Sequence, residues 1–274
     1  MKKYIAIFAC MLTVLACAPK KQHLVILHLN DTHSHFEPLR TGPEAGQGGV
    51  IERAAYIDSV RRAEGKNNVL LLHAGDFSQG SSYFTKLGGD LEIETINAMK
   101  YDCVTLGNHE FDNGIEDLGR RLSSLKCPVV CANYDFTQFE AGKYIKPYII
   151  LERGGYKIGI FGLLCDISRM VDRTISDRIP HLDDVAEANR WSDFLKNQEH
   201  CDLVIALTHI GYEDEPFTDP VMVSQVRNLD LVVGGHSHTF LDEMKYATDP
   251  DGREVPIVQN GCWGLYMGKI EIDD

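Results

Sequence analysis

Residues of the types that bind metal ions stand directly after five apolar runs of the chain. These groups are Asp31-Thr32-His33, Gly75-Asp76, Gly107-Asn108-His109-Glu110, Thr208-His209 and Gly234-Gly235-His236-Ser237-His238. Imidazole nitrogens with carboxylate and amide oxygens suit divalent transition-metal ions. Two such ions held about 3.5–4 Å apart need a shared carboxylate, and Asp76 is our candidate for that bridge. The pattern therefore predicts a centre for two metal ions.

A single histidine would not support this prediction, because most histidines are satisfied core or surface side chains. We interpret six in that ordinary way, with two of them, His35 and His73, as candidate neighbours of the ligands. The six are His23, His28, His35, His73, His181 and His200. The occurrence of five groups in order, each at the end of an apolar run, is what indicates a metal centre.

The elements that must position these groups alternate along the chain. Apolar runs at 24–29, 69–72, 103–106, 129–131, 203–208 and 229–233 predict buried strands. Helical spacing recurs from residue 50 and at 91–99, 115–125, 185–195 and 221–226. Segments 148–152 with 157–163, and 254–259 with 265–272, are typical of hairpins. This order predicts an α/β fold with mixed sheets, in which the polar groups meet at the carboxyl ends of the strands.

Composition narrows the class of protein. The chain has 274 residues, 44% hydrophobic and 24% charged, which is typical of a folded protein. A net charge of −13 argues against a nucleic acid polymer as partner. Six cysteines follow the first segment, and we expect most of them to be buried free thiols. Whether Cys127 and Cys131 form a disulfide stays open.

The first segment is interpreted as a targeting signal. Lys2 and Lys3 precede an apolar stretch that ends in Val14-Leu15-Ala16-Cys17, which resembles a bacterial lipobox. We expect residues 1–16 to be a signal peptide, Cys17 to carry a lipid, and residues 17–274 to form one catalytic domain. A buried helix of the same composition is the alternative. The expected location is exported, periplasmic or outer-membrane-associated, with the lipid as the only link to a membrane.

Together, the five polar groups resemble the signature of calcineurin-like metallophosphoesterases. Three further motifs are similar to the bacterial 5′-nucleotidase and UDP-sugar hydrolase branch. They are Gly48-Gly49-Val50 with Arg53-Ala54-Ala55, Ala74-Gly75-Asp76 with Gln79-Gly80, and Gly107-Asn108-His109-Glu110-Phe111-Asp112. The resemblance runs from about Leu24 to the end of the chain. It implies a four-layer α/β/β/α sandwich with the metals at its upper edge.

The resemblance also implies a role for each residue. One ion would be bound by Asp31, His33 and His238, the other by Asn108, His209 and His236, with Asp76 between them, and His109 with Asp112 would form the catalytic dyad. Physically, His109 follows a metal ligand and can reach a phosphoryl oxygen, while Asp112 can orient its ring. Asp112 could instead cap the helix that begins near Ile115, and Glu110 is expected to steady the loop. The donor set does not choose among Zn, Mn, Fe and Co.

Two functions are weighed from these residues. The leading one is an exported phosphohydrolase that uses metal-activated water on a small phosphate ester, namely a nucleotide or related compound. The competing one is a non-catalytic metal-binding surface lipoprotein or binding subunit. An intact His109 and Asp112 favour the enzyme, whereas fully enclosed ions would favour the binding protein.

Typical 5′-nucleotidases continue into a second, substrate-binding domain, whereas this chain stops at Asp274. We expect either a separate polypeptide that supplies this domain or a domain that acts alone on simpler esters. A docking partner would require an exposed apolar patch around the metal site.

Overall fold

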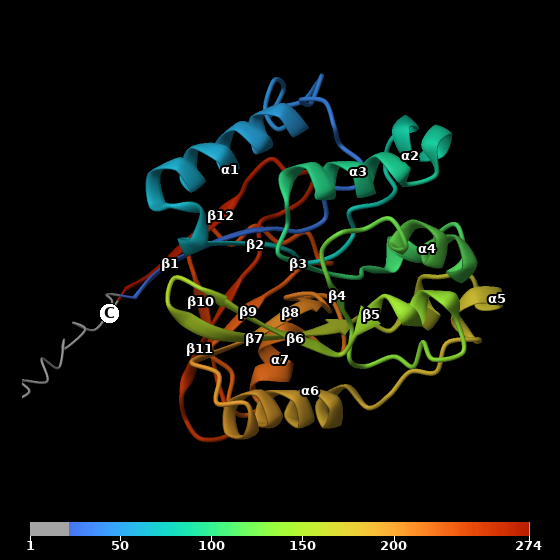
Figure 1. The fold of residues 1–274 in the computed structure, drawn as a ribbon. Coiled ribbons are helices and arrows are strands. Elements are labelled where there is room, and N and C mark those ends of the chain that lie inside the picture. The colour runs from blue at the N-terminus through green and yellow to red at the C-terminus, as the bar shows by residue number, and fades with distance from the viewer. Residues whose placement is uncertain (1–21, 274) are drawn as a thin grey trace, which may run out of the picture.

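Two six-stranded β-sheets pack face to face, with helices on both outer faces (Figure 1). The computed structural model describes residues 22–273. The predicted signal segment, residues 1–16, and Cys17 lie outside the described residues. No helix among the described residues has the length and apolar character needed to cross a membrane.

The first sheet has the order β12-β1-β2-β3-β4-β5, and only its β12–β1 pair is antiparallel. Its strands are β1 (His23–Leu29), β2 (Val69–His73), β3 (Cys103–Thr105), β4 (Val129–Val130), β5 (Ile145–Lys146) and β12 (Gly268–Asp273). The second sheet has the order β10-β11-β9-β8-β7-β6, with antiparallel pairs at both edges. Its strands are β6 (Tyr148–Arg153), β7 (Tyr156–Leu164), β8 (Leu203–His209), β9 (Leu231–Val233), β10 (Lys245–Thr248) and β11 (Glu254–Val258).

Seven α-helices accompany these strands in the described part of the chain. They are α1 (Val50–Glu64), α2 (Ser82–Leu87), α3 (Asp90–Met99), α4 (Ile115–Leu122), α5 (Arg173–Ser176), α6 (Asp184–Asp193) and α7 (Asp219–Val223). Helices α1, α3 and α4 cover the outer face of the first sheet, and α6 and α7 cover the outer face of the second.

Three apolar layers hold this arrangement together. In β1, Val25 and Leu27 pack toward the helices, while Leu24 and Ile26 pack toward the second sheet. Successive side chains of a strand point to opposite faces, so a strand buried on both sides reads as one continuous apolar run. This confirms the predicted four-layer α/β/β/α sandwich with mixed sheets.

The predicted hairpin at the end of the chain is wrong. Strand β11 pairs with β10 and β9 in the second sheet, whereas β12 pairs with β1 in the first. Both segments alternate like neighbouring strands, but β12 instead covers the edge of β1 that would otherwise stay unpaired. The edge strands β5 and β10 were not predicted, because short, partly exposed edge strands lack an apolar run.

The cysteines agree with the sequence-based interpretation. All six described cysteines are free thiols, and Cys103, Cys165 and Cys201 are buried in the apolar layers or beside them. Cys127 and Cys131 are not bonded to each other.

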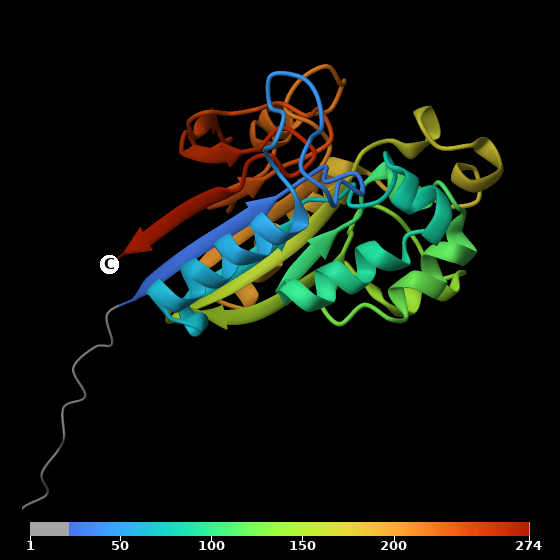
Figure 2. The ribbon, with the colours of Figure 1, turned by 90° about the horizontal axis from the view of Figure 1, so that it is seen from above.

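The topology brings distant segments to one end of the sandwich. Parallel strands of both sheets end there, and the loop after β1 lies beside the loops between β9 and β12 (Figure 2, blue and orange to red). The Trp263 amide donates a hydrogen bond to the Asp31 carbonyl oxygen over 2.6 Å, which joins these loops directly.

We expect Leu207→Ala to destabilise the fold by about 3 kcal/mol, because it opens a cavity between the two sheets. Leu207 has no exposed surface and contributes to the layer between them. Urea unfolding measures the change. The matched substitution Ile51→Ala, at a side chain that is 73% exposed, should change stability by less than about 0.5 kcal/mol. Equal effects of the two substitutions would contradict this account of the core.

Candidate metal centre

The predicted ligands come together at the shared carboxyl end of the strands. Asp31 and His33 follow β1, Asp76 follows β2, and His209 ends β8. His236 and His238 follow β9, and Asn108 begins the 3₁₀ turn η2 (Asn108–Phe111) after β3. Six of these side chains, without Asn108, fall into groups whose potential ligand atoms lie within 4.8 Å of one another. Asn108 is buried and adjoins His109, whose backbone amide donates to Asp76 Oδ1 over 2.9 Å.

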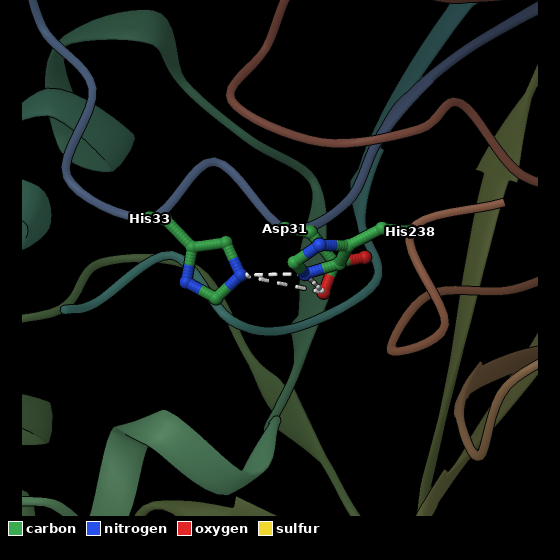
Figure 3. A group of neighbouring side chains, drawn as sticks. All are labelled: Asp31, His33 and His238. Carbon is green, nitrogen blue, oxygen red and sulfur yellow. Dashed lines mark hydrogen bonds and ion pairs between the residues drawn. The ribbon is translucent and has the colours of Figure 1, made fainter. Parts of the chain in front are cut away.

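The first group consists of Asp31, His33 and His238, whose side chains point toward one another (Figure 3). The Nε2 atoms of His33 and His238 are 2.8 Å apart, and they lie 3.8 and 3.5 Å from Asp31 Oδ1. Ligand atoms about 2.1 Å from one ion lie about 3.0–3.4 Å from one another. The three distances lie on both sides of this range, so the three side chains are spaced approximately for a single ion.

The second group consists of Asp76, His209 and His236. His209 Nε2 lies 3.1 Å from Asp76 Oδ2, yet this fully buried nitrogen makes no aligned hydrogen bond. Asp76 Oδ2 is also 3.9 Å from His33 Nε2 in the first group. Asp76 thus faces both groups, as a bridging carboxylate must, and the free Nε2 of His209 fits a metal ligand.

Unusual backbone geometry aims these side chains. Five of the seven predicted ligands adopt left-handed φ angles between 45° and 87°, which are Asp31, His33, Asp76, His236 and His238. Such conformations cost a non-glycine residue on the order of 1–3 kcal/mol and persist only where surrounding contacts hold them. They turn the chain so that residues two apart, such as His236 and His238, can face one site.

Glycines allow the close approach of the strand ends. A Cβ at Gly107 would lie 2.1 Å from Asp76 Oδ1, and a Cβ at Gly75 would lie 2.7 Å from His209 Nδ1. Any side chain at these two positions would displace a predicted ligand.

Glu110 stabilises the ligand loops, as the sequence predicted. Its carboxylate accepts hydrogen bonds from the backbone amides of Gly107, Asp76 and Ser78, over 2.6, 2.9 and 3.0 Å. Burial, followed by the nearby Asp76 carboxylate, raises the pKa of Glu110 to about 7. His209 is oriented in a similar way, because its Nδ1 donates to the Ala74 carbonyl oxygen over 2.6 Å and leaves Nε2 facing the site.

His109 and Asp112 form a hydrogen-bonded pair, with Nδ1 donating to Oδ2 over 2.9 Å. Burial lowers the pKa of His109, but the bond to Asp112 and the nearby carboxylate charges, Asp76 first among them, together outweigh this effect, and the net shift is upward. The two side chains are 33% and 30% exposed. Asp112 does not cap the following helix, because Gly114 occupies the N-cap position of α4. The alternative role for Asp112 is therefore wrong.

The electrostatics of the metal-free site are dominated by the two buried aspartates. Burial lowers the pKa of His209, but the carboxylates of Asp76 and Asp31 outweigh it and raise that pKa to about 9. Contacts with Asp31 and Cys262 raise the pKa of His238 to about 10, whereas burial lowers that of His236 to about 4.

Some residues around the site were not singled out from the sequence. Cys262 contacts His238, and the Trp263 ring stacks on His35 with centroids 5.2 Å apart. These two residues lie close to the opposite end of the chain from Asp31, and no local pattern links them to it. His35 and His73 do lie beside the ligand loop, and His73 Nε2 is 3.1 Å from Thr32 Oγ1.

Two mixed sheets with aspartate, asparagine and histidine side chains at their carboxyl edge define the class of metallophosphoesterases. In agreement, the family model for calcineurin-like phosphoesterase matches residues 24–240. The chain therefore belongs to the calcineurin-like phosphoesterase family, whose members use divalent metals. The resemblance inferred from the motifs is confirmed.

Relatives share this architecture over nearly the whole described chain. The 5′-nucleotidase of Homo sapiens is 36% identical, with 92% of this chain and 47% of that protein covered. The 5′-nucleotidase precursor of Thermus thermophilus superposes with a TM-score of 0.82 at 30% identity, covering 91% of this chain and 51% of that one. The NAD nucleotidase of Haemophilus influenzae superposes with a TM-score of 0.79 at 29% identity, covering 93% of this chain and 53% of that one. The chain thus spans about half the length of these relatives.

We expect the metal-free protein to lose stability as the pH rises from 6.5 to 9. The folded pKa of His209, about 9, exceeds its unfolded value of 6.5. The protonated ring therefore stabilises the fold fully below pH 6.5 and progressively less up to pH 9. A loss on the order of 1–3 kcal/mol should appear in urea unfolding with a chelator present.

His209→Gln should reduce this pH dependence, because it removes one of the rings whose pKa is raised and leaves His238, whose pKa is raised to about 10. The matched substitution His200→Gln, at an exposed histidine, should preserve it. The electrostatic account would be contradicted if the free energy of unfolding of the unsubstituted, metal-free chain stayed constant or rose across this pH range.

Proposed function

We propose that this chain hydrolyses phosphate esters of nucleotides or related compounds at a dinuclear metal centre. The observation that carries the proposal is that Asp76 belongs to one ligand group, with His209 and His236, and faces His33 of the other group, next to the His109–Asp112 pair. In this proposal Asp31, His33 and His238 hold one ion, and Asn108, His209 and His236 hold the other. Two divalent ions bound there would lower the pKa of an attacking water and neutralise charge that develops on the phosphoryl group.

The residues of the chain have separate tasks in this reaction. His109 Nδ1 donates to Asp112, which leaves the opposite ring nitrogen for the substrate. As a cation, the ring stabilises a phosphoryl oxygen in the transition state, or it protonates the leaving oxygen. Asp112 favours the cation and fixes the orientation of the ring.

Accessibility favours the enzyme over a non-catalytic metal protein. His109 is one-third exposed, and the side chain of His238 is 41% exposed, so solvent reaches both residues. A purely structural site is expected to be closed around its ions. It would also have no use for a histidine–aspartate pair beside the ligands.

The proposed substrate class follows from the relatives, which are 5′-nucleotidases and an NAD nucleotidase. We propose that a substrate-binding partner docks beside the site. Phe240, Trp263 and Tyr266 are 49%, 39% and 41% exposed and adjoin the loops of the site, and Phe240 and Tyr266 pack together with centroids 4.3 Å apart. This aromatic surface supports the proposal, since docking requires exposed apolar area.

We further propose that residues 17–274 form one catalytic domain of an exported protein that is anchored through a lipid on Cys17. The support is the basic and apolar composition of residues 1–16 and the motif that ends at Cys17. The two ions of the centre would be Zn, Mn, Fe or Co, among which the ligand types do not choose.

We expect His109→Ala to lower the rate of phosphate release about 10²–10⁴-fold while metal binding is retained, because the ring acts on the substrate rather than on the ions. The assay measures inorganic phosphate from AMP, UDP-glucose, cyclic nucleotides and p-nitrophenyl phosphate. Each is tested with Zn²⁺, Mn²⁺, Fe²⁺ or Co²⁺, with and without a candidate partner domain.

The control for this experiment is His200→Ala, which removes an exposed histidine far along the chain and should leave the rate unchanged. A metal-loaded chain that is inert toward every ester, both alone and with the partner, would contradict the proposed activity. Unchanged turnover in His109→Ala would contradict the assigned role of the ring.

Cys17→Ser should move the protein from the membrane fraction to the soluble fraction of a bacterial host, because the thiol that accepts the lipid is lost. Fractionation and incorporation of labelled palmitate measure this change. Cys262→Ser, which leaves the lipobox intact, is the matched control. The proposed anchor would be contradicted if Cys17→Ser stayed in the membrane fraction and the unsubstituted protein incorporated no labelled palmitate.

A further inference from the structure

A small cavity lies behind the loop that carries Asp31 and His33, between β2 and α3. Its volume, counted as the space that the centre of a water molecule can occupy, is about 20 Å³. Its wall includes Thr32 and Ser34, the two sequence neighbours of His33, but none of the proposed ligands. The cavity is therefore separate from the metal centre and in contact with the backbone that shapes it.

Two buried polar residues of this wall connect the cavity to the loop. Glu92 is 3% exposed, and its Oε1 accepts a hydrogen bond from the Ser34 hydroxyl. His73 is 1% exposed, and its Nε2 lies within hydrogen-bonding distance of Thr32 Oγ1. The remaining polar atoms of these side chains, Glu92 Oε2 and His73 Nδ1, are buried without a partner in the protein.

The chemistry of the wall selects the occupant of the cavity. A buried water needs about 10–15 Å³ of such space and two or more polar partners. The volume is sufficient, and Glu92 and His73, which both line the cavity, each offer one polar atom without a partner in the protein. A cation is disfavoured, because the guanidinium of buried Arg53 also lines the cavity. Burial lowers the pKa of His73 to about 3, so the ring is neutral and can either donate to a water or accept from it.

We propose that Glu92 and His73 are positioning residues for the first metal ion. Through one buried water and their bonds to Ser34 and Thr32, they hold His33 in the conformation that turns its ring toward Asp31 and His238. His33 and Ser34 have left-handed φ angles of 45° and 54°, and such strained residues need contacts on both sides. This inference rests on the proposed metal centre.

Mn²⁺ binding tests the proposal, with affinity measured by equilibrium dialysis and site geometry by the spin-resonance spectrum of the bound ion. Ser34→Ala and Glu92→Met each remove the bond to the loop, and each should weaken one of two Mn²⁺ sites about tenfold or more. The double variant should bind Mn²⁺ with about the same affinity as the weaker-binding single variant, because both changes break the same bond.

Conservative and control variants separate positioning from general damage. Glu92→Gln keeps an acceptor for Ser34 and should bind Mn²⁺ within about threefold of the unsubstituted chain. Glu94→Gln changes an exposed carboxylate on the same helix and should have no effect. Unchanged affinity and an unchanged spectrum in both Ser34→Ala and Glu92→Met would overturn the proposal.

A second readout works without metal and separates this inference from the proposed function. Amides of residues 32–36 in the metal-free chain should exchange about tenfold faster in Ser34→Ala, while those of α6 stay unchanged. If the unsubstituted chain binds no Mn²⁺, the proposed function fails, and the exchange result still decides the role of Glu92. Equal exchange rates in the unsubstituted chain and in Ser34→Ala would then overturn the proposed role of Glu92.

A high-resolution crystal structure tests the proposed water. It should show one water bonded to Glu92 Oε2 and His73 Nδ1, and a dry cavity would overturn the proposal that a water links these residues.

Discussion

The structure depends on the burial of two aspartates side by side at the end of the sheets. Asp31 and Asp76 are 0% and 2% exposed, and the cationic groups paired with them are histidines. Burying a carboxylate is costly unless it is paired and hydrogen-bonded, and two carboxylates in one site multiply the cost. In the metal-free protein the proton on His209 offsets part of it, as the direction of its pKa shift indicates. Divalent cations would offset far more, which is why this arrangement suits a metal centre better than a structural ion pair.

Several layers of support hold these carboxylates in place. Asp31 accepts a hydrogen bond from the His236 backbone amide, and Asp76 accepts one from that of His109. Glu110 binds the amide of Asp76 itself, and the buried Arg121 in turn donates to the Glu110 carbonyl oxygen over 2.5 Å. These supports come from the loop after β9, from the turn η2 after β3 and from α4. The strained ligand conformations are therefore maintained by the whole edge of the sandwich rather than by any one loop.

This dependence explains why the site lies where both sheets end. The first sheet contributes Asp31, His33, Asp76 and Asn108, and the second contributes His209, His236 and His238. Leu24 and Ile26 of β1 belong to the same buried apolar layer between the sheets as Ile205 and Leu207 of β8. That packing fixes the relative position of the two halves of the ligand set. A change in the core that shifts one sheet against the other would therefore separate Asp76 from His209.

Local sequence patterns determined the strands buried on both faces and the polar groups that follow them, and the family resemblance of those groups implied each proposed ligand. Those features are local, because a buried strand is a continuous apolar run and the ligands stand within a few residues of its end. Other features required the tertiary structure, because they depend on contacts between residues far apart in the chain. The pairing of β12 with β1, the positions of Cys262 and Trp263 beside residues of the ligand loops, and the support of Ser34 by Glu92 are examples. The sequence could name the side chains of the site, but only the packing of two sheets brought them within bonding distance.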